Sequence, residues 1–179
     1  MEFLIKPDAD RFPNFIPPAR ATAKAAGFDL FAQEDMIITG DTVLFDLGFR
    51  TKVPKDHVAI IFPRSGLGAK FHVELSNTNG VIDEDYTGLW MAALHLGGKG
   101  TKVEQLDWLS AAYEQSSFKE IPDIDDDEDQ KALLIKRGDA FAQVLFFPVP
   151  DVEVVITHEE LPETDRGEGG FGSTTKASA

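Results

Sequence analysis

FAQVLFF, residues 141–147, is the stretch that most clearly predicts the fold of this chain. It surrounds one polar side chain, Gln143, with six apolar residues, which is typical of a buried strand. Similar runs recur along the chain, and Gly, Pro, Asp and Asn separate them. The expected strands are FDLFA (28–32), TVLFDLGF (42–49), VAIIF (58–62), LWMAALHL (89–96), FAQVLFF (141–147) and VEVVI (152–156). This pattern indicates an all-β sandwich or barrel.

The composition restricts the class of protein further. The 179 residues, 42% of them hydrophobic, are enough for one domain with a real core. We see no signal peptide in MEFLIKPDAD, no apolar run of membrane-spanning length and no cysteine, so a cytoplasmic setting is expected. The net charge of −14, from 31 acidic and 17 basic residues, argues against binding to duplex nucleic acid.

Residues 97–130 interrupt the strand pattern and are expected to form an insertion. Val103, Leu106, Leu109 and Tyr113 have helical spacing, which predicts a short amphipathic helix. DIDDDEDQ (123–130) follows as an acidic loop. We expect a β domain over residues 1–161 and a flexible arm over 162–179.

Two further stretches carry residues suited to binding an anion or a small ligand. PRSGLGAK (63–70) places Arg64, Ser65 and Gly66 after a predicted buried strand, where bare backbone amides can meet an anion. The same residues also fit an ordinary turn, which is the expectation from this stretch alone. Gln143 must find a polar partner inside its apolar strand, either backbone, water or ligand.

NTNGVIDEDYTG (77–88) combines an apolar pair with acids and an aromatic ring. Asp83 follows Val81 and Ile82, and a carboxylate beside an apolar pocket can act as a general base. Tyr86, three residues later, can form a wall for a flat or sugar-like ligand. A hairpin turn with solvated acids is the alternative for this stretch.

RGEGGFGSTT (166–175), near the end of the chain, is too rich in glycine to build a core. Arg166 can pair with phosphate, the glycines let backbone amides approach oxygen atoms, and Phe171 can stack on a base. The hydroxyls of Ser173 and Thr174 add donors. These features fit a lid over a nucleotide, and a disordered terminus is the alternative.

Taken together, five stretches in order resemble the motifs of the trimeric dUTP pyrophosphatases (dUTPases). They are AGFDLFA (26–32), PRSGLGAK (63–70), GVIDEDYTG (80–88), RGDAFAQVLF (137–146) and RGEGGFGST (166–174). The resemblance implies a jelly-roll homotrimer whose active sites are each shared among three subunits. Some phage-encoded members have comparable insertions, which points to a phage origin.

The resemblance also implies a reaction: hydrolysis of dUTP to dUMP and pyrophosphate, which keeps uracil out of DNA and supplies dUMP for thymidylate synthesis. Asp83 matches the general base that activates water against the α-phosphorus, and Asp29 matches an outer-shell partner of the metal. Mg²⁺ is expected to be held mainly by the substrate phosphates. The residues that match substrate contacts are Arg64, Ser65, Gly66, Asn77, Gly80, Val81, Ile82, Tyr86, Gln143, Arg166, Phe171, Gly172, Ser173 and Thr174.

Two alternatives to this function stay open at the level of sequence. A dCTP deaminase resembles the same fold, but it needs a glutamate near the cytosine amine, and LWMAALHL (89–96) offers none. A protein-binding regulatory module would use the insertion as its contact surface, whereas an insertion that only caps its own subunit would have no such partner.

Overall fold

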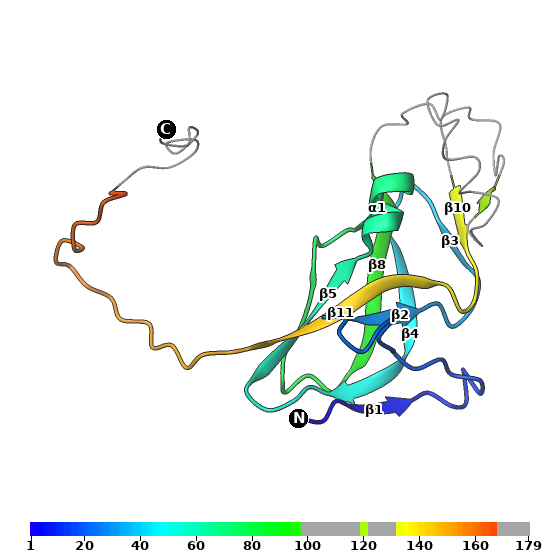
Figure 1. Cartoon of the computed structure of the whole chain (residues 1–179), viewed down its shortest axis with the longest axis horizontal. Coiled ribbons are helices and arrows are strands. Elements are labelled where there is room, and N and C mark those ends of the chain that lie inside the picture. The colour runs from blue at the N-terminus through cyan, green and yellow to red at the C-terminus, as the bar shows by residue number, and fades with distance from the viewer. Residues whose placement is uncertain (98–118, 122–131, 168–179) are drawn as a thin grey trace.

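A computed structural model describes residues 1–97, 119–121 and 132–167 of the chain (Figure 1). Strands dominate, and one short helix accompanies them. The elements in chain order are β1 (Leu4–Pro7), β2 (Phe28–Phe31), β3 (Met36–Ile38), β4 (Val43–Lys52), β5 (His57–Pro63), α1 (Ser65–Phe71), β6 (Val73–Leu75), β7 (Gly80–Ile82), β8 (Leu89–Leu96), β9 (Lys119–Ile121), β10 (Ala132–Ile135) and β11 (Ala140–Pro148). The predicted all-β jelly-roll class is therefore confirmed.

The strands form two four-stranded sheets and one three-stranded sheet. Their orders are β1-β4-β8-β6, β2-β11-β5-β7 and β3-β10-β9. Alternating side chains of the two larger sheets are buried in one hydrophobic cluster. Phe3 links the two sheets, because its ring contacts Trp90 of β8 at 5.7 Å and Phe146 of β11 at 4.8 Å between ring centroids. Aromatic burial of this kind stabilises the fold by about 1.5–3 kcal/mol per side chain.

Five of the six predicted strands are confirmed, with ends that differ by at most three residues. The strand predicted at 42–49 is observed as β4, which continues to Lys52. The strand predicted at 89–96 coincides with β8. The prediction for 152–156 is wrong, since the chain has no strand between 149 and 167. A strand needs a neighbour for its backbone hydrogen bonds, and this segment leaves the body of the subunit after β11 (Figure 1).

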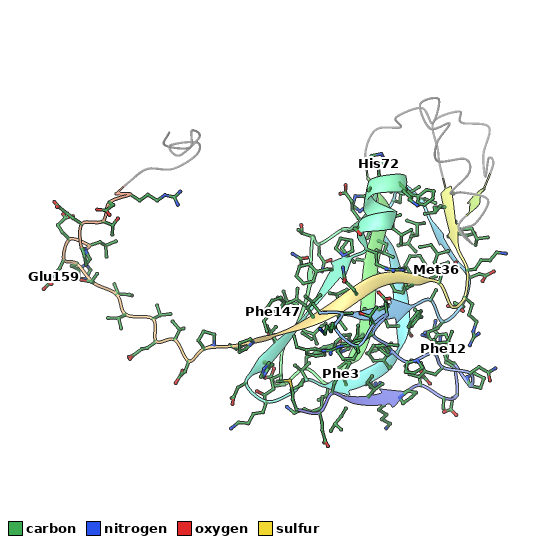
Figure 2. The ribbon with its side chains drawn as sticks, in the orientation of Figure 1. Phe3, Phe12, Met36, His72, Phe147 and Glu159 are labelled. Atoms are coloured by element: carbon green, nitrogen blue, oxygen red, sulfur yellow. The ribbon has the colours of Figure 1, made fainter. Side chains whose placement is uncertain are left out.

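The segment 149–167, called the arm below, exposes apolar side chains along its length. The exposed fractions of Val154 and Ile156 are 88% and 82%, and Figure 2 shows the arm near Glu159 lying away from the core around Phe3. Isolated apolar side chains on a surface are ordinary, but several in sequence on an extended segment indicate a covered surface in the working assembly.

Helix α1 corrects the prediction of a turn at 63–70. Gly66 and Gly68 lower the helix propensity of this stretch, so its sequence does not predict a helix. Leu67, which is 3% exposed, anchors the helix in the core. His72 ends it in a left-handed conformation, with φ of 55°, and donates its N–H to the carbonyl of Gly68 at 3.0 Å.

Most of the predicted insertion, 98–118 and 122–130, lies outside the described residues, and so does the amphipathic helix predicted near 103–113. Strand β9, which falls within the insertion, pairs with β10 in the three-stranded sheet. The division into a domain over 1–161 and an arm over 162–179 stays a prediction. Among the described helices, none is long and apolar enough to cross a membrane.

Candidate active site

Three of the predicted site residues lie together where β2, β11 and β5 adjoin. Gln143 of β11 is paired in register with Asp29 of β2 on one side and with Phe62 of β5 on the other. The amide nitrogen of Gln143 donates to the carbonyl oxygen of Pro63 at 3.3 Å, which supplies the polar partner that this buried strand requires. Its amide oxygen is left to accept a hydrogen bond from a ligand or water.

Arg64 joins this group directly after β5. Its Nε lies 3.4 Å from Oδ1 of Asp29, and its Nη1 donates to the carbonyl oxygen of Ala140 at 3.1 Å. The guanidinium group of this side chain, which is 40% exposed as a whole, is therefore held between an acid and a backbone acceptor. Its planar set of donors can serve these two acceptors and still face a phosphate oxygen.

Gly27 is a residue of this group to which sequence reasoning assigned no role. A Cβ atom added there would lie 3.0 Å from the amide oxygen of Gln143 and 3.1 Å from Cδ1 of Leu145. The close packing of Gln143 over the backbone therefore favours glycine, because a larger residue would push these two side chains away by a few tenths of an ångström. The signal in the sequence is Gly27 itself, within AGFDLFA, but only the sheet register reveals which side chain it accommodates.

The first turn of α1 presents backbone amides beside Arg64. The first helical hydrogen bond runs from the N–H of Gly68 to the carbonyl of Arg64 at 3.0 Å, so the amides of residues 65–67 precede the helical bonding pattern. A Cβ atom added at Gly66 would meet nothing within 4 Å among the described residues. The side of Gly66 that a side chain would occupy is therefore open.

The second group of predicted site residues lies on the hairpin that leads into β7. Strand β7 pairs with β5, with Gly80 opposite Ile61 and Ile82 opposite Ala59. A Cβ atom at Gly80 would come within 3.3 Å of the Ile61 side chain, so glycine allows the two strands to approach. Asn77 and Val81 are exposed at this hairpin, and Val81 has 61% of its surface exposed.

Asp83 and Tyr86 lie in the turn after β7. The N–H of Tyr86 donates to the carbonyl of Asp83 at 3.2 Å, and the Tyr86 hydroxyl donates to the carbonyl of Leu89 at 2.9 Å. These bonds fix the tyrosine ring across the turn while leaving 43% of the residue exposed. The ring covers Gly88, where an added Cβ would lie 2.5 Å from the hydroxyl oxygen.

The three consecutive acids of this turn have different environments. Glu84 accepts a hydrogen bond from the backbone N–H of Asp56 at 2.7 Å and lies 3.5 Å from the Lys52 amine. The hydrogen bond from Asp56, followed by the charge of Lys52, holds the pKa of Glu84 below its ordinary value of 4.5. Asp83 and Asp85 are exposed, and neither carboxylate has an ion pair within the described part of the chain. Glu84 therefore serves the fold, and Asp83 is available for chemistry.

The register places these two groups apart within one chain. Gln143 is opposite Phe62 of β5, whereas Ile82, the residue before Asp83, is opposite Ala59. Because residues of a strand advance by about 3.3 Å each, Asp83 and Gln143 are offset by about 13 Å along β5. They also lie on strands that flank β5 from opposite sides. A single chain therefore does not bring the Asp83 carboxylate to Gln143 and Arg64.

The remaining predicted residues belong to the arm. Arg166 is exposed near the end of the described arm, where the N–H of Gly167 donates to the carbonyl of Thr164 at 3.0 Å. Phe171, Gly172, Ser173 and Thr174 lie outside the described residues. Within the described ranges, no three His, Asp or Glu side chains come together as a metal site.

Comparison with known proteins gives these groups a context. A family model described as dUTPase matches residues 14–103. The deoxyuridine 5'-triphosphate nucleotidohydrolase of Nautilia profundicola is 34% identical over 160 residues, covering 89% of this chain and 90% of that protein. The enzyme of the same name from Eremothecium gossypii is 32% identical over 167 residues, covering 92% and 86%.

Solved structures show the same fold. A mutant dUTPase of Staphylococcus bacteriophage 80alpha with dUpNHpp superposes with a TM-score of 0.70 at 19% identity, covering 97% of this chain and 98% of that one. A mutant dUTPase from phage phi11 of S. aureus, described with a structural Mg(II) ion, gives a TM-score of 0.64 at 18% identity, covering 89% and 98%. The family model matches half of this chain, and relatives with about one-third identity align along nearly all of it. This chain therefore belongs to the dUTPase family.

Proposed function

We propose that the protein hydrolyses dUTP to dUMP and pyrophosphate, with Asp83 as the general base. The position of Asp83 carries this proposal, because its carboxylate is exposed directly after β7, at the end of the hairpin, whereas Glu84 is engaged with Lys52 and Asp56. Asp85 is exposed as well but lies two residues further from β7. The physiological role that follows is to keep uracil out of DNA and to supply dUMP.

The reaction requires one proton transfer and one displacement at phosphorus. Asp83 accepts a proton from a water molecule as the water oxygen bonds to the α-phosphorus. The bond between the α-phosphorus and the oxygen that bridges it to the β-phosphorus breaks, and pyrophosphate leaves with the electron pair. Phosphoryl transfer of this kind depends mainly on positioning and on neutralising charge.

The two groups of site residues divide the work of binding. Arg64 and the backbone amides of Ser65 and Gly66 contact the phosphates, because they combine a held cation with backbone donors. The side-chain amide of Gln143 holds the α-phosphate and the water, since its nitrogen has a second N–H beside the one given to Pro63 and its oxygen can accept from water. Asn77 and the backbone of Gly80, Val81 and Ile82 form the slot for uracil. Tyr86 packs on the deoxyribose, where a 2′-hydroxyl would meet its ring.

Mg²⁺ is assigned mainly to the phosphates and to water, and it would neutralise part of the phosphate charge that would otherwise repel the base. The donor chemistry fits this arrangement. Among the described residues, Asp29 is the carboxylate that forms an ion pair with Arg64, and this pair favours an outer-shell role for it. The chain thus supplies orientation around the ion more than direct ligands.

We further propose that the active enzyme is a homotrimer with shared sites. The offset of about 13 Å between Asp83 and Gln143 along β5 supports this, because a second chain can bring the base to the phosphate group of the first. The arm, with its exposed Val154 and Ile156, is covered by a neighbouring subunit in the same assembly. Arg166 at the end of the arm, and Phe171, Gly172, Ser173 and Thr174 beyond it, then close over the nucleotide of that neighbour.

The charge-neutral variant Asp83→Asn tests the base directly. Pyrophosphate release from dUTP and Mg²⁺ is expected to fall about 100- to 10,000-fold, the range of general-base catalysis, while binding of dUTP persists. Asp85→Asn is the matched control, because Asp85 is equally exposed two residues away, and it is expected to keep activity within a few-fold. Full activity in Asp83→Asn would refute the assignment, and ammonia release from dCTP would favour the deaminase.

Two further assignments accompany this function. We place the enzyme in the cytoplasm, a setting that fits a sequence without cysteine. A protein partner that binds the insertion at 97–130 stays a prediction. A chain lacking residues 98–130 that hydrolyses dUTP and loses a binding partner would support it, whereas a chain that fails to fold would show that the insertion stabilises its own subunit.

A further inference from the structure

Three side chains form a hydrogen-bonded chain at one end of the sheet β1-β4-β8-β6. The Thr42 hydroxyl donates to Oγ of Ser76 at 2.9 Å, and Oγ of Ser76 lies 3.0 Å from Nδ1 of His95. We call these three residues the hairpin clamp. Thr42 precedes β4, His95 belongs to β8 and Ser76 follows β6, so the clamp joins three neighbouring strands.

Glu74 lies beside the second ring nitrogen of His95. Its carboxylate lies 3.8 Å from Nε2 of His95 across the β6–β8 pair. In the neutral tautomer with the hydrogen on Nε2, on the side of Glu74, Nδ1 accepts from the Ser76 hydroxyl. Ser76 then both accepts from Thr42 and donates to His95, so its side chain has one preferred direction.

Ser76 is the residue before Asn77, and the clamp therefore acts at the start of the hairpin. The backbone of Ser76 is also bound, because its N–H donates to the carbonyl of Ala93 at 2.9 Å. Beyond it the chain turns sharply: Thr78 has a left-handed φ of 65° and donates its N–H to the carbonyl of Leu75 at 2.8 Å. A displacement of Ser76 is passed to Asn77 through a single rigid peptide unit.

The hairpin connects two short edge strands. Strands β6 and β7 have three residues each and lie at the edges of their sheets, where β8 is the one partner of β6 and β5 the one partner of β7. Among the described residues, the hydrogen-bonded side chains of the clamp lie at the β6 end. Short edge strands fray easily, so side-chain bonds at this end contribute more to the geometry of the hairpin than they would inside a sheet.

We propose that Ser76, held by Thr42 and His95, is a positioning residue for recognition of the base, acting through Asn77. The inference rests on the proposed function, because the role of the hairpin in binding uracil is part of it. The clamp residues themselves do not touch the substrate. They fix the slot in its binding geometry before the nucleotide arrives, which reduces the ordering that binding requires.

The test compares steady-state kinetics of dUTP hydrolysis in the wild type and in Ser76→Ala. Loss of the clamp is expected to raise KM about three- to tenfold with kcat within about twofold, as expected for one lost hydrogen bond that acts on binding. The preference for dUTP over dCTP in kcat/KM falls by a similar factor. His95→Leu reproduces this result, whereas His95→Asn, whose amide can lie near the position of Nδ1, restores KM toward the wild-type value.

Thr39→Ala is the matched control. It removes a side-chain bond of the same kind, from the N–H of Asp41 to the Thr39 hydroxyl at 3.3 Å, near the same end of the fold but outside the clamp. Melting temperature and mass in solution are measured for every variant, and Thr42→Val replaces Ser76→Ala if the latter does not fold. A normal KM in folded clamp variants, or an equal rise in Thr39→Ala, overturns the clamp alone. A wild-type chain without dUTP turnover overturns the proposed function and the clamp together.

Discussion

Replacing Gly88 by alanine tests whether the fixed position of Tyr86 matters for catalysis. The added methyl carbon would lie 2.5 Å from the Tyr86 hydroxyl oxygen and 2.6 Å from Cζ, whereas ordinary contacts begin near 3.4 Å. The ring must therefore withdraw by about 0.9 Å, the difference between these distances. Gly88 does not have a positive φ, so the substitution acts through this contact and not through backbone strain.

The expected loss follows from two effects of this displacement. The hydroxyl bond to the carbonyl of Leu89, now 2.9 Å, is broken, which costs about 0.5–1.5 kcal/mol. A misplacement of about 1 Å in a group that positions the substrate can lower the rate up to about 100-fold. We therefore expect kcat/KM for dUTP to fall about 10- to 100-fold. The preference for dUTP over UTP is expected to fall as well, because the ring no longer blocks the 2′-hydroxyl.

The assay measures pyrophosphate release from dUTP and from UTP at saturating Mg²⁺. Gly40→Ala is the control, because an added Cβ at Gly40 meets nothing within 4 Å among the described residues and its φ is not positive. It should leave kcat/KM unchanged. An unchanged kcat/KM together with unchanged selectivity in Gly88→Ala would refute the role assigned to the tyrosine ring.

Three further outcomes are expected. Glu84→Gln should lower the melting temperature at pH 7 but not in acid. Folding lowers the pKa of Glu84, so the stability that its carboxylate contributes is present above pH 4.5 and is lost as the pH falls below that value. The melting curves of both proteins should therefore converge at low pH. Thr51→Val should raise the free energy of unfolding in urea by about 1 kcal/mol, because the Thr51 hydroxyl has no hydrogen-bond partner in the described part of the chain and valine has the same shape; a loss of stability would contradict this. Arg64→Lys should raise KM for dUTP about tenfold, since an ammonium group cannot bridge Asp29 and a phosphate as the planar guanidinium can, and an unchanged KM would contradict it.

The strands could be predicted because their residues carry a local signal. β8 coincides with the predicted 89–96, and alternate residues of it, from Trp90 to Leu94, are buried while Met91 is exposed. The helix α1 could not be predicted, because two glycines oppose it and the burial of Leu67 supports it only in the folded core. The prediction of a strand at 152–156 is wrong for a similar reason. The pattern VEVVI is typical of a strand, but a local pattern does not show whether a neighbouring strand is present to pair with it.

The candidate site divides in the same way. Asp83, Arg64 and Gln143 could be proposed as candidates from short motifs, since each motif keeps the residues that the chemistry needs close together in sequence, and their roles stay predictions. Other contacts join residues that lie between 19 and 116 positions apart or depend on sheet register. They are the ion pair of Arg64 with Asp29, the packing of Gln143 against Gly27 and the clamp at Ser76. No local pattern encodes such contacts.

The amino-acid sequence by itself determined the all-β class, the order of the motifs and the residue types available for chemistry, because alternation, turns and motifs are local properties of the chain. Only the tertiary structure decided that Glu84 is engaged while Asp83 and Asp85 are exposed, how closely side chains approach the glycines, and that Asp83 lies about 13 Å along β5 from Gln143. Those outcomes depend on strand register and packing, because these bring residues that are distant in sequence into contact with the same hydrogen-bond donors and the same space.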